Sequence, residues 1–236
     1  MASLLFPTAR GPYRDVDMTE PRWQLAGGAG GILFVLLVVG IVLWAPLTTS
    51  VPEPAFDGPA RDWLAYARAI AGQTMPEAPV GVLGIFGFVL FAVCLAVRFQ
   101  PAGERMSVPS ILVVLTAGLT TALWLVDDGF GLAAAFRARD LDPTTASLFY
   151  GLSNGVFAVS WFAIGALLVA AGLGTLASGA LPGWLGWSAL VVGAGYCVAA
   201  CFPLTALWFA PYGLFYLWVV AVSVVLLRGA LAALRA

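Results

Sequence analysis

PTTASLFYGLSNGVFAVSWFAIGALLVAAGLGTLASGALPGWLGWSALVVGAGYCVAACFPLTALWFAPYGLFYLWVVAVSVVLL, from Pro143 to Leu227, is a stretch without a single charged residue. It contains three apolar runs, each comparable in length to the roughly 20 residues that a membrane-spanning helix needs. Three further apolar runs of similar length precede this stretch. The six predicted spans are Ala26–Leu47, Pro79–Val97, Val108–Val126, Ala146–Leu176, Trp184–Cys201 and Ala206–Leu227.

The composition of the whole chain agrees with lipid as its solvent. Hydrophobic residues make up 61% and charged residues 10%, against roughly 45–50% and about 25% in an average soluble domain. We therefore predict an all-α, polytopic membrane protein, a bundle of six transmembrane helices over residues 26–228. Residues 1–25 and 229–236 are predicted to be cytosolic tails, and the lipid bilayer is the expected partner.

Several classes of site are disfavoured by residues that the chain lacks. The net charge of −1 gives no footprint for nucleic acid. All 11 cations are Arg, so no Lys can form a Schiff base, and the absence of His removes the commonest metal ligand and general base. The three cysteines form no CxxC motif. We expect no cofactor and no metal.

The distribution of Arg predicts the orientation in the membrane. With both termini in the cytosol, seven Arg lie inside, namely Arg10, Arg14, Arg22, Arg98, Arg105, Arg228 and Arg235. Four lie outside, namely Arg61, Arg68, Arg137 and Arg139. Cytoplasmic loops are enriched in Lys and Arg, so this orientation is favoured over its reverse.

Two larger loops then face the outside, and each is predicted to contain a short helix. In the first, Thr48–Glu77, apolar residues share one helical face: Trp63, Leu64, Ala67 and Ile70. Such an amphipathic helix is expected to lie in the outer membrane interface. Packing over the mouth of the bundle is the alternative.

The second loop, Asp127–Thr145, is rich in charge. A short helix is expected at Leu132–Phe136, with the charged side chains pairing among themselves or lying in solvent. An ionic cluster is predicted from Arg137, Arg139, Asp140 and Asp142.

Glycine is placed where small residues would let helices approach closely. Packing inside the bundle is the expected role, and a dimer face is the alternative, so a second copy of the chain is one candidate partner. The glycines concerned are Gly81, Gly84 and Gly87 in the second span, Gly151 and Gly155 in the fourth, and Gly193 and Gly195 in the fifth.

Polar and aromatic residues of the spans fall in the outer half of the bundle. We hypothesise an outward-opening vestibule with Asp127 or Asp128 at its mouth and Asn154 as its deepest strong hydrogen-bonding group. Its aromatic wall would consist of Trp124, Tyr150, Tyr196, Tyr212 and Tyr216. The alternative is an interfacial aromatic belt, with Asn154 only joining two helices.

The segment SGALPGWLGW, from Ser178 to Trp187, resembles the junction between two helices in a group of bacterial six-helix membrane proteins, of the domain-of-unknown-function 4386 type. The resemblance covers residues 145–200, and the long first outer loop departs from it. It implies a six-span bundle in a bacterial plasma membrane, and it implies no activity.

These observations favour a binding role. We expect an apolar or amphipathic ligand, or a membrane-protein partner, to bind from the outer leaflet in a sensing, accessory or assembly role. A small transporter or channel is one alternative. A lipid-modifying enzyme that uses outer-loop Asp and Arg is the other, although Asp127, Asp128, Asp140 and Asp142 have no recognisable metal-binding spacing.

Overall fold

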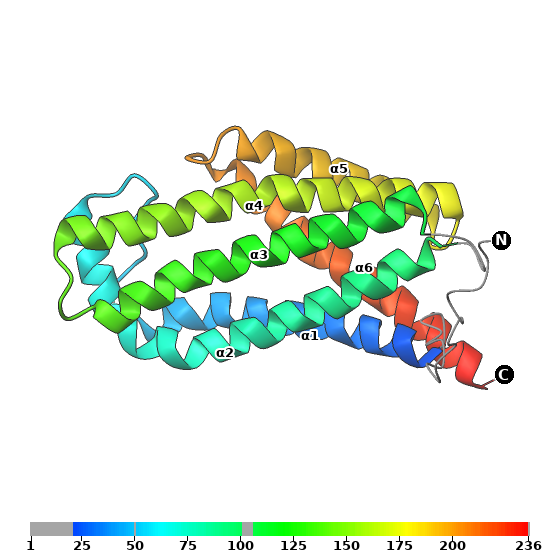
Figure 1. Ribbon diagram of the computed structural model, residues 1–236, viewed down its shortest axis with the longest axis horizontal. Coiled ribbons are helices and arrows are strands. Elements are labelled where there is room, and N and C mark those ends of the chain that lie inside the picture. Colours follow the sequence, from blue (N-terminus) through cyan, green and yellow to red (C-terminus); the bar gives the residue numbers. More distant parts are fainter. Residues whose placement is uncertain (1–20, 50, 101–105, 236) are drawn as a thin grey trace, which may run out of the picture.

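In the computed structural model every regular element is helical (Figure 1), over the residues that the structure describes: 21–49, 51–100 and 106–235. Most of the predicted tail 1–25 and residues 101–105 lie outside these ranges. The elements are α1 Pro21–Thr48, α2 Ala60–Arg98, α3 Val108–Arg137, α4 Pro143–Ser178, α5 Gly183–Ala200, the 3-10 helix η1 Ala206–Trp208 and α6 Phe209–Arg235.

Six of these helices are long and apolar enough to cross a membrane, so the chain is a multi-pass membrane protein by helix length and hydropathy. The all-α prediction is thereby confirmed, and the arrangement is consistent with a six-span bundle. The candidate spans are Pro21–Trp44, Glu77–Arg98, Val108–Arg137, Pro143–Ser178, Gly183–Ala200 and Ala206–Arg235.

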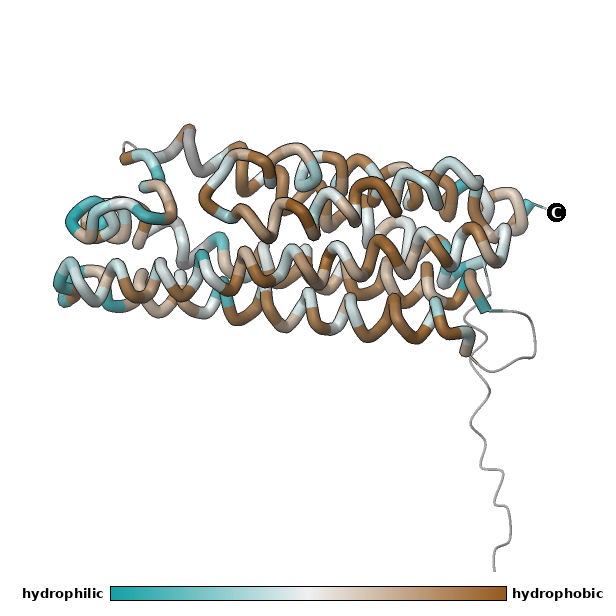
Figure 2. The backbone as a smooth tube through the Cα atoms, turned by 90° about the horizontal axis from the view of Figure 1, so that it is seen from above, coloured by the Kyte–Doolittle hydropathy of each residue, from teal (hydrophilic) through white to brown (hydrophobic). Residues whose placement is uncertain are grey.

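The start of α1 and the end of α6 lie at the same end of the bundle (Figure 1). We call this the proximal end, and the opposite end, which holds residues 51–59 and 138–142, the distal end. Hydrophobic residues cover most of the helix length, and hydrophilic residues gather at the distal end (Figure 2).

Five helices form a ring in the order α1, α2, α4, α5 and α6, and α3 packs outside it against α2 and α4. Trp124 of α3 reaches the ring interior and stacks on Phe34 of α1, with ring centroids 5.5 Å apart. On the other side, the Trp218 indole N–H of α6 donates to the carbonyl oxygen of Leu185 in α5 at 3.0 Å. A buried indole needs such a partner because lipid offers none.

Glycine pairs set the closest helix contacts. A Cβ on Gly87 of α2 would lie 2.6 Å from the carbonyl oxygen of Gly30 in α1, and a Cβ on Gly30 would lie 2.7 Å from that of Gly87. Gly165 of α4 and Gly193 of α5 form a similar pair, at 3.0 and 2.9 Å. The packing role is therefore confirmed for Gly87 and Gly193.

The glycines predicted in the fourth span behave differently. Gly151 and Gly155 are exposed, and a Cβ on either would meet no atom within 4 Å. Their packing role inside the bundle is therefore wrong, because no described helix packs closely against α4 at these two positions.

Two helix ends follow from local sequence signals. Ser107 caps α3, and its hydroxyl accepts a hydrogen bond from the Ser110 N–H at 3.3 Å. Gly179 ends α4 with a φ of 65°, a left-handed conformation that glycine adopts without strain. The Pro182–Gly183 junction that follows starts α5, and Trp184 and Trp187 lie exposed on its first turns.

The short loop helices are not separate elements, so that prediction is wrong. α2 runs unbroken from Ala60 to Arg98, and α3 continues to Arg137. Glycine and proline disfavour a helix interior, yet α2 continues through Gly72 and Pro76. Trp63 and Ala67, at most 1% exposed, pack its distal part against α3 and α4. Residues 229–235, predicted as a tail, likewise continue α6.

The Gly30–Gly87 contact can be tested by adding one carbon atom. We expect Gly87→Ala to lower the free energy of unfolding by about 1–3 kcal/mol, because the new Cβ must push α1 away from α2. Thermal unfolding of the purified protein in mild detergent measures the change. Gly84→Ala is the matched control, since the nearest atom to its Cβ is 3.6 Å away; equal losses in both variants would contradict the contact's role.

Candidate distal polar site

The distal segment of α2 packs against the adjoining ends of α3 and α4. The Trp63 ring stacks on Tyr150 of α4 at 4.9 Å, and Tyr66 contacts both rings edge-on, at 6.1 and 5.7 Å. The Arg68 guanidinium donates to the carbonyl oxygens of Ala138 and Leu141, at 3.3 and 3.5 Å. These contacts place the segment on the bundle end, as the alternative reading expected, rather than alone in the membrane interface.

Asp127 joins α3 to α4. It lies within helix α3, not in a loop as predicted, and its carboxylate accepts a hydrogen bond from the Ser153 hydroxyl of α4. The side chain is half-buried, and no ion pair to it is found among the described residues. Within a membrane-spanning helix an unpaired carboxylate is costly, and such residues usually have a functional role.

Asp128 takes a different position from its neighbour. Its side chain is exposed, and its Oδ2 lies 3.8 Å from the site where a Cβ would stand on Gly81 of α2. Adjacent helical residues point about 100° apart, so Asp127 faces α4 while Asp128 faces α2.

Buried polar atoms without a partner border the same region. The Asn154 Nδ2 and the Tyr150 hydroxyl have no hydrogen-bond partner, and Tyr150 is only 6% exposed. Deeper in the ring, the Tyr196 hydroxyl is also without a partner and its side chain is fully buried. These atoms are available to a ligand or to water that enters the distal half.

The remaining predicted aromatic residues line the ring interior. Tyr212 and Tyr216 of α6 lie with ring centroids 5.0 Å apart, and their hydroxyl groups are hydrogen-bonded to each other. Tyr212 is close enough to Asp127 and Asp128 to interact with both electrostatically. Trp124 lies in the same core, against Phe34.

The predicted vestibule residues therefore form two adjoining groups rather than one wall. Trp124, Tyr196, Tyr212 and Tyr216 belong to the main core, and Tyr150 belongs to a smaller distal core with Trp63. Asp127 contacts α4 through Ser153 and interacts electrostatically with Tyr212 of the main core.

Three polar residues of this region were missed. Ser153, which is hydrogen-bonded to Asp127, precedes Asn154 by one residue and was not among the predicted site residues. Glu53 and Glu77 were not among them either. Glu53 interacts electrostatically with Asp127, Tyr66 and Tyr150, and protein atoms packed around its partly exposed carboxylate raise its pKa.

The predicted pairing within the second outer loop is wrong. Among the described residues the ion pair found is Arg61–Asp62, at 3.5 Å, and it lies on the exposed start of α2. Asp142 instead caps α4 and accepts hydrogen bonds from the Thr144 and Thr145 N–H groups and the Thr145 hydroxyl. Capping satisfies backbone N–H groups that have no helical partner. The other three members, Arg137, Arg139 and Asp140, are exposed.

Charge separates along the bundle axis. All eight acids in the described ranges lie in the distal half: Glu53, Asp57, Asp62, Glu77, Asp127, Asp128, Asp140 and Asp142. The described arginines divide equally, with Arg22, Arg98, Arg228 and Arg235 at the proximal end. Within these ranges no group of three or more Cys, Asp or Glu is arranged to hold a metal ion.

Comparison of the chain with protein families, curated proteins and solved structures finds no match. The resemblance of residues 145–200 to the bacterial six-helix group therefore gains no support from a family match. What the structure shows is six apolar helices long enough to cross a membrane.

The cap of α4 predicts a pH dependence. The hydrogen bond from the Thr145 hydroxyl, with those from the backbone, lowers the pKa of Asp142 from its usual 3.8. The charged cap therefore stabilises the fold above that pH, and its contribution is lost as the pH falls through the lowered pKa. We expect the wild type to lose thermal stability relative to Asp142→Asn below about pH 4, because Asn accepts the same backbone hydrogen bonds without titrating. Parallel melting curves for the two proteins across this range would contradict the prediction.

Proposed function

We propose that the protein binds an amphipathic ligand in the distal half of its bundle, which faces the outer leaflet of a bacterial plasma membrane. The proximal end, with the start of α1 and the end of α6, would lie in the cytosol. The charge distribution supports this orientation: the described proximal residues carry four Arg and no acid, and positive charge favours the cytoplasmic side. The role would be sensing, accessory or assembly.

The observation that carries the proposal is the setting of Asp127. Its carboxylate lies inside a candidate span, has a neutral hydroxyl partner, Ser153, and interacts electrostatically with Tyr212 of the main core. A polar head could bind at Asp127 and at the free Nδ2 of Asn154, while the aromatic core beside it would receive an apolar group. Ligand sites commonly combine a few polar groups with an apolar lining in this way.

A role in transport or in lipid modification is less well supported than ligand binding. Fully buried polar side chains in the described chain are hydroxyls and one amide: Gln24, Ser110, Thr120, Ser160, Thr175 and Ser223. Several of these hydroxyls already bond to backbone carbonyl oxygens, as Ser110 does to Ala96 at 2.8 Å. Those bonded hydroxyls act as links within and between helices. Gln24, Thr175 and Ser223 have buried polar atoms without a partner, and none of these three side chains is charged.

The proposal predicts the loss of a bound molecule. The wild type, purified from membranes in mild detergent, should carry a non-covalent adduct in native mass spectrometry. We expect Asp127→Asn to reduce its occupancy roughly tenfold, because a charged hydrogen-bonding group contributes about 1.5–3 kcal/mol. Asn154→Ala should also reduce it, and Ser153→Ala should do so less.

Asp140→Asn and Ser188→Ala are the matched controls. Asp140 is exposed in the loop before α4, and the Ser188 hydroxyl bonds to the Leu185 carbonyl oxygen near the proximal end. Both should keep the adduct at the wild-type level. If Asp127→Asn and Asn154→Ala keep it too, while folding normally by circular dichroism, the distal half is not the binding site.

A further inference from the structure

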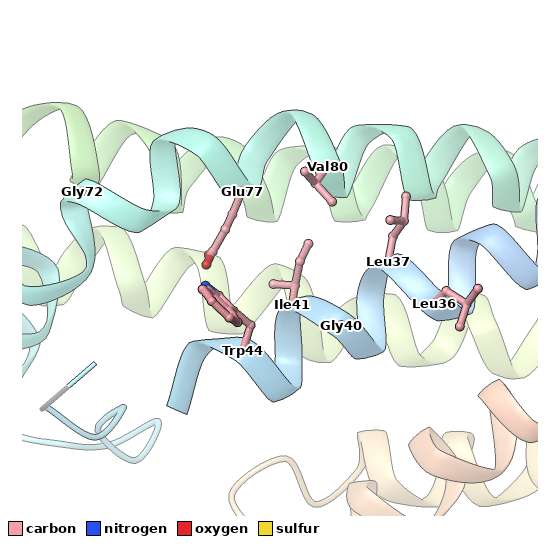
Figure 3. Close-up of a pocket in the computed structure, with 8 residues that line it drawn as sticks. All are labelled: Leu36, Leu37, Gly40, Ile41, Trp44, Gly72, Glu77 and Val80. Carbon is pink, nitrogen blue, oxygen red and sulfur yellow. The ribbon is translucent and has the colours of Figure 1, made fainter. Parts of the chain in front are cut away.

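A separate groove opens between α1 and α2 on the surface of the bundle (Figure 3). Its volume is about 440 Å³, and its lining combines aliphatic residues and glycines with one carboxylate and one indole: Leu36, Leu37, Gly40, Ile41, Trp44, Gly72, Glu77 and Val80. This is within the usual range of ligand sites, about 300–1,000 Å³. Glu77 borders the distal polar region described above, and the other lining residues lie outside it.

Glu77 is the one charged residue in the lining. Its carboxylate and the Trp44 ring point toward one another across the groove (Figure 3). No ion pair to Glu77 is found in the described part of the chain, and its Oε1 is buried without a hydrogen-bond partner. A carboxylate without an ion pair at the mouth of an apolar groove favours a cation by charge.

The two ends of the groove differ along the membrane axis: the distal end carries the carboxylate and the indole, and the deeper end is aliphatic. Trp44 ends the first candidate span and Glu77 begins the second, so both lie at the distal edge of the apolar layer. Leu37 lies seven residues deeper on α1, about 10 Å at 1.5 Å per residue. A bound molecule with a charged head at Glu77 would thus place an apolar chain toward the membrane centre.

The apolar part continues further along α1. A second groove of about 720 Å³ shares Leu36 with the first and runs on between α1 and α2. Its other lining residues are Ala26, Ala29, Gly30, Ile32, Leu33, Leu83, Phe86, Gly87, Leu90 and Leu227. The two grooves together form a track with one charged end and an aliphatic remainder.

We propose that this track binds a single-chain alkylammonium amphiphile, with its cationic head at Glu77 and Trp44 and its alkyl chain along α1. Charge complementarity selects the head, and the lengthwise order of carboxylate, indole and aliphatic residues sets its direction. Gly40 and Gly72 keep the head end open, since a Cβ on either would meet no atom within 4 Å. The site is distinct from the one proposed at Asp127.

Binding of radiolabelled dodecyltrimethylammonium to the protein in phosphatidylcholine nanodiscs tests the proposal, with empty nanodiscs subtracted. We expect saturable binding, and Glu77→Gln should raise the Kd roughly tenfold. Gly40→Leu should abolish binding by filling the groove, and its added atoms enter open space, so the fold is retained. Melting temperature and circular dichroism verify folding of each variant.

The controls separate charge, shape and site. Dodecyl sulfate and dodecanol should not compete, and a phosphatidylethanolamine in the nanodisc should not displace the probe. Asp140→Asn should bind the probe as the wild type does. Asp127→Asn should also bind it normally, because its expected loss of the native adduct concerns the other site.

Four results would overturn the proposal. Equal competition by dodecanol would show a groove that binds any alkyl chain, and displacement by phosphatidylethanolamine would show that a lipid is the occupant. An unchanged Kd in Glu77→Gln, or a loss in Asp140→Asn as large as in Glu77→Gln, would show that the cation does not bind at this carboxylate.

Discussion

The backbone contact between α1 and α2 fixes the frame in which the other helices pack. At Gly30 and Gly87 the two chains are too close to accept a Cβ on either side. Lipid tails are as apolar as the helices, so association in a membrane depends on such close packing rather than on burial of apolar surface from water. The neighbouring Gly28 and Gly31 bring α6 against the same helix, at Leu227 and Ser223. Phe34 follows one turn later and receives Trp124 from outside the ring.

Much of this frame could be predicted from the sequence, because a spanning helix must be apolar over a fixed length. The six spans, the junction at Pro182 and the packing role of Gly87 and Gly193 follow from that rule and from small-residue spacing. Helix ends at the distal side could not be predicted. There Gly72 and Pro76 disfavour a helix interior, yet α2 continues through both, and Trp63 and Ala67 pack its distal part against α3 and α4. Such contacts join residues far apart in sequence.

For the distal site, the sequence predicted the types of residue better than the hydrogen bonds between them. The depth of each residue in its span placed Asp127 and the tyrosines of α6 in the same layer, and Tyr212 interacts electrostatically with Asp127. Ser153 was missed, because one residue changes the direction of a helical side chain by about 100°. The role of Asp142 was missed too: a carboxylate before Pro143 is an ordinary N-cap, but its placement among other charges suggested an ion pair instead.

The unbroken α2 has a mechanical consequence. Its 39 residues form a rod of about 58 Å. Along this rod lie Trp63, which packs in the distal core, the Glu77 carboxylate, Gly81 beside Asp128 and Gly87 against Gly30. A torque applied at its distal third would turn all of these together, since a continuous helix twists little along its length. Pro76 and Pro79 each lack a backbone N–H, yet the helix runs through both. The distal end of the molecule and the apolar layer are thus joined by one continuous helix.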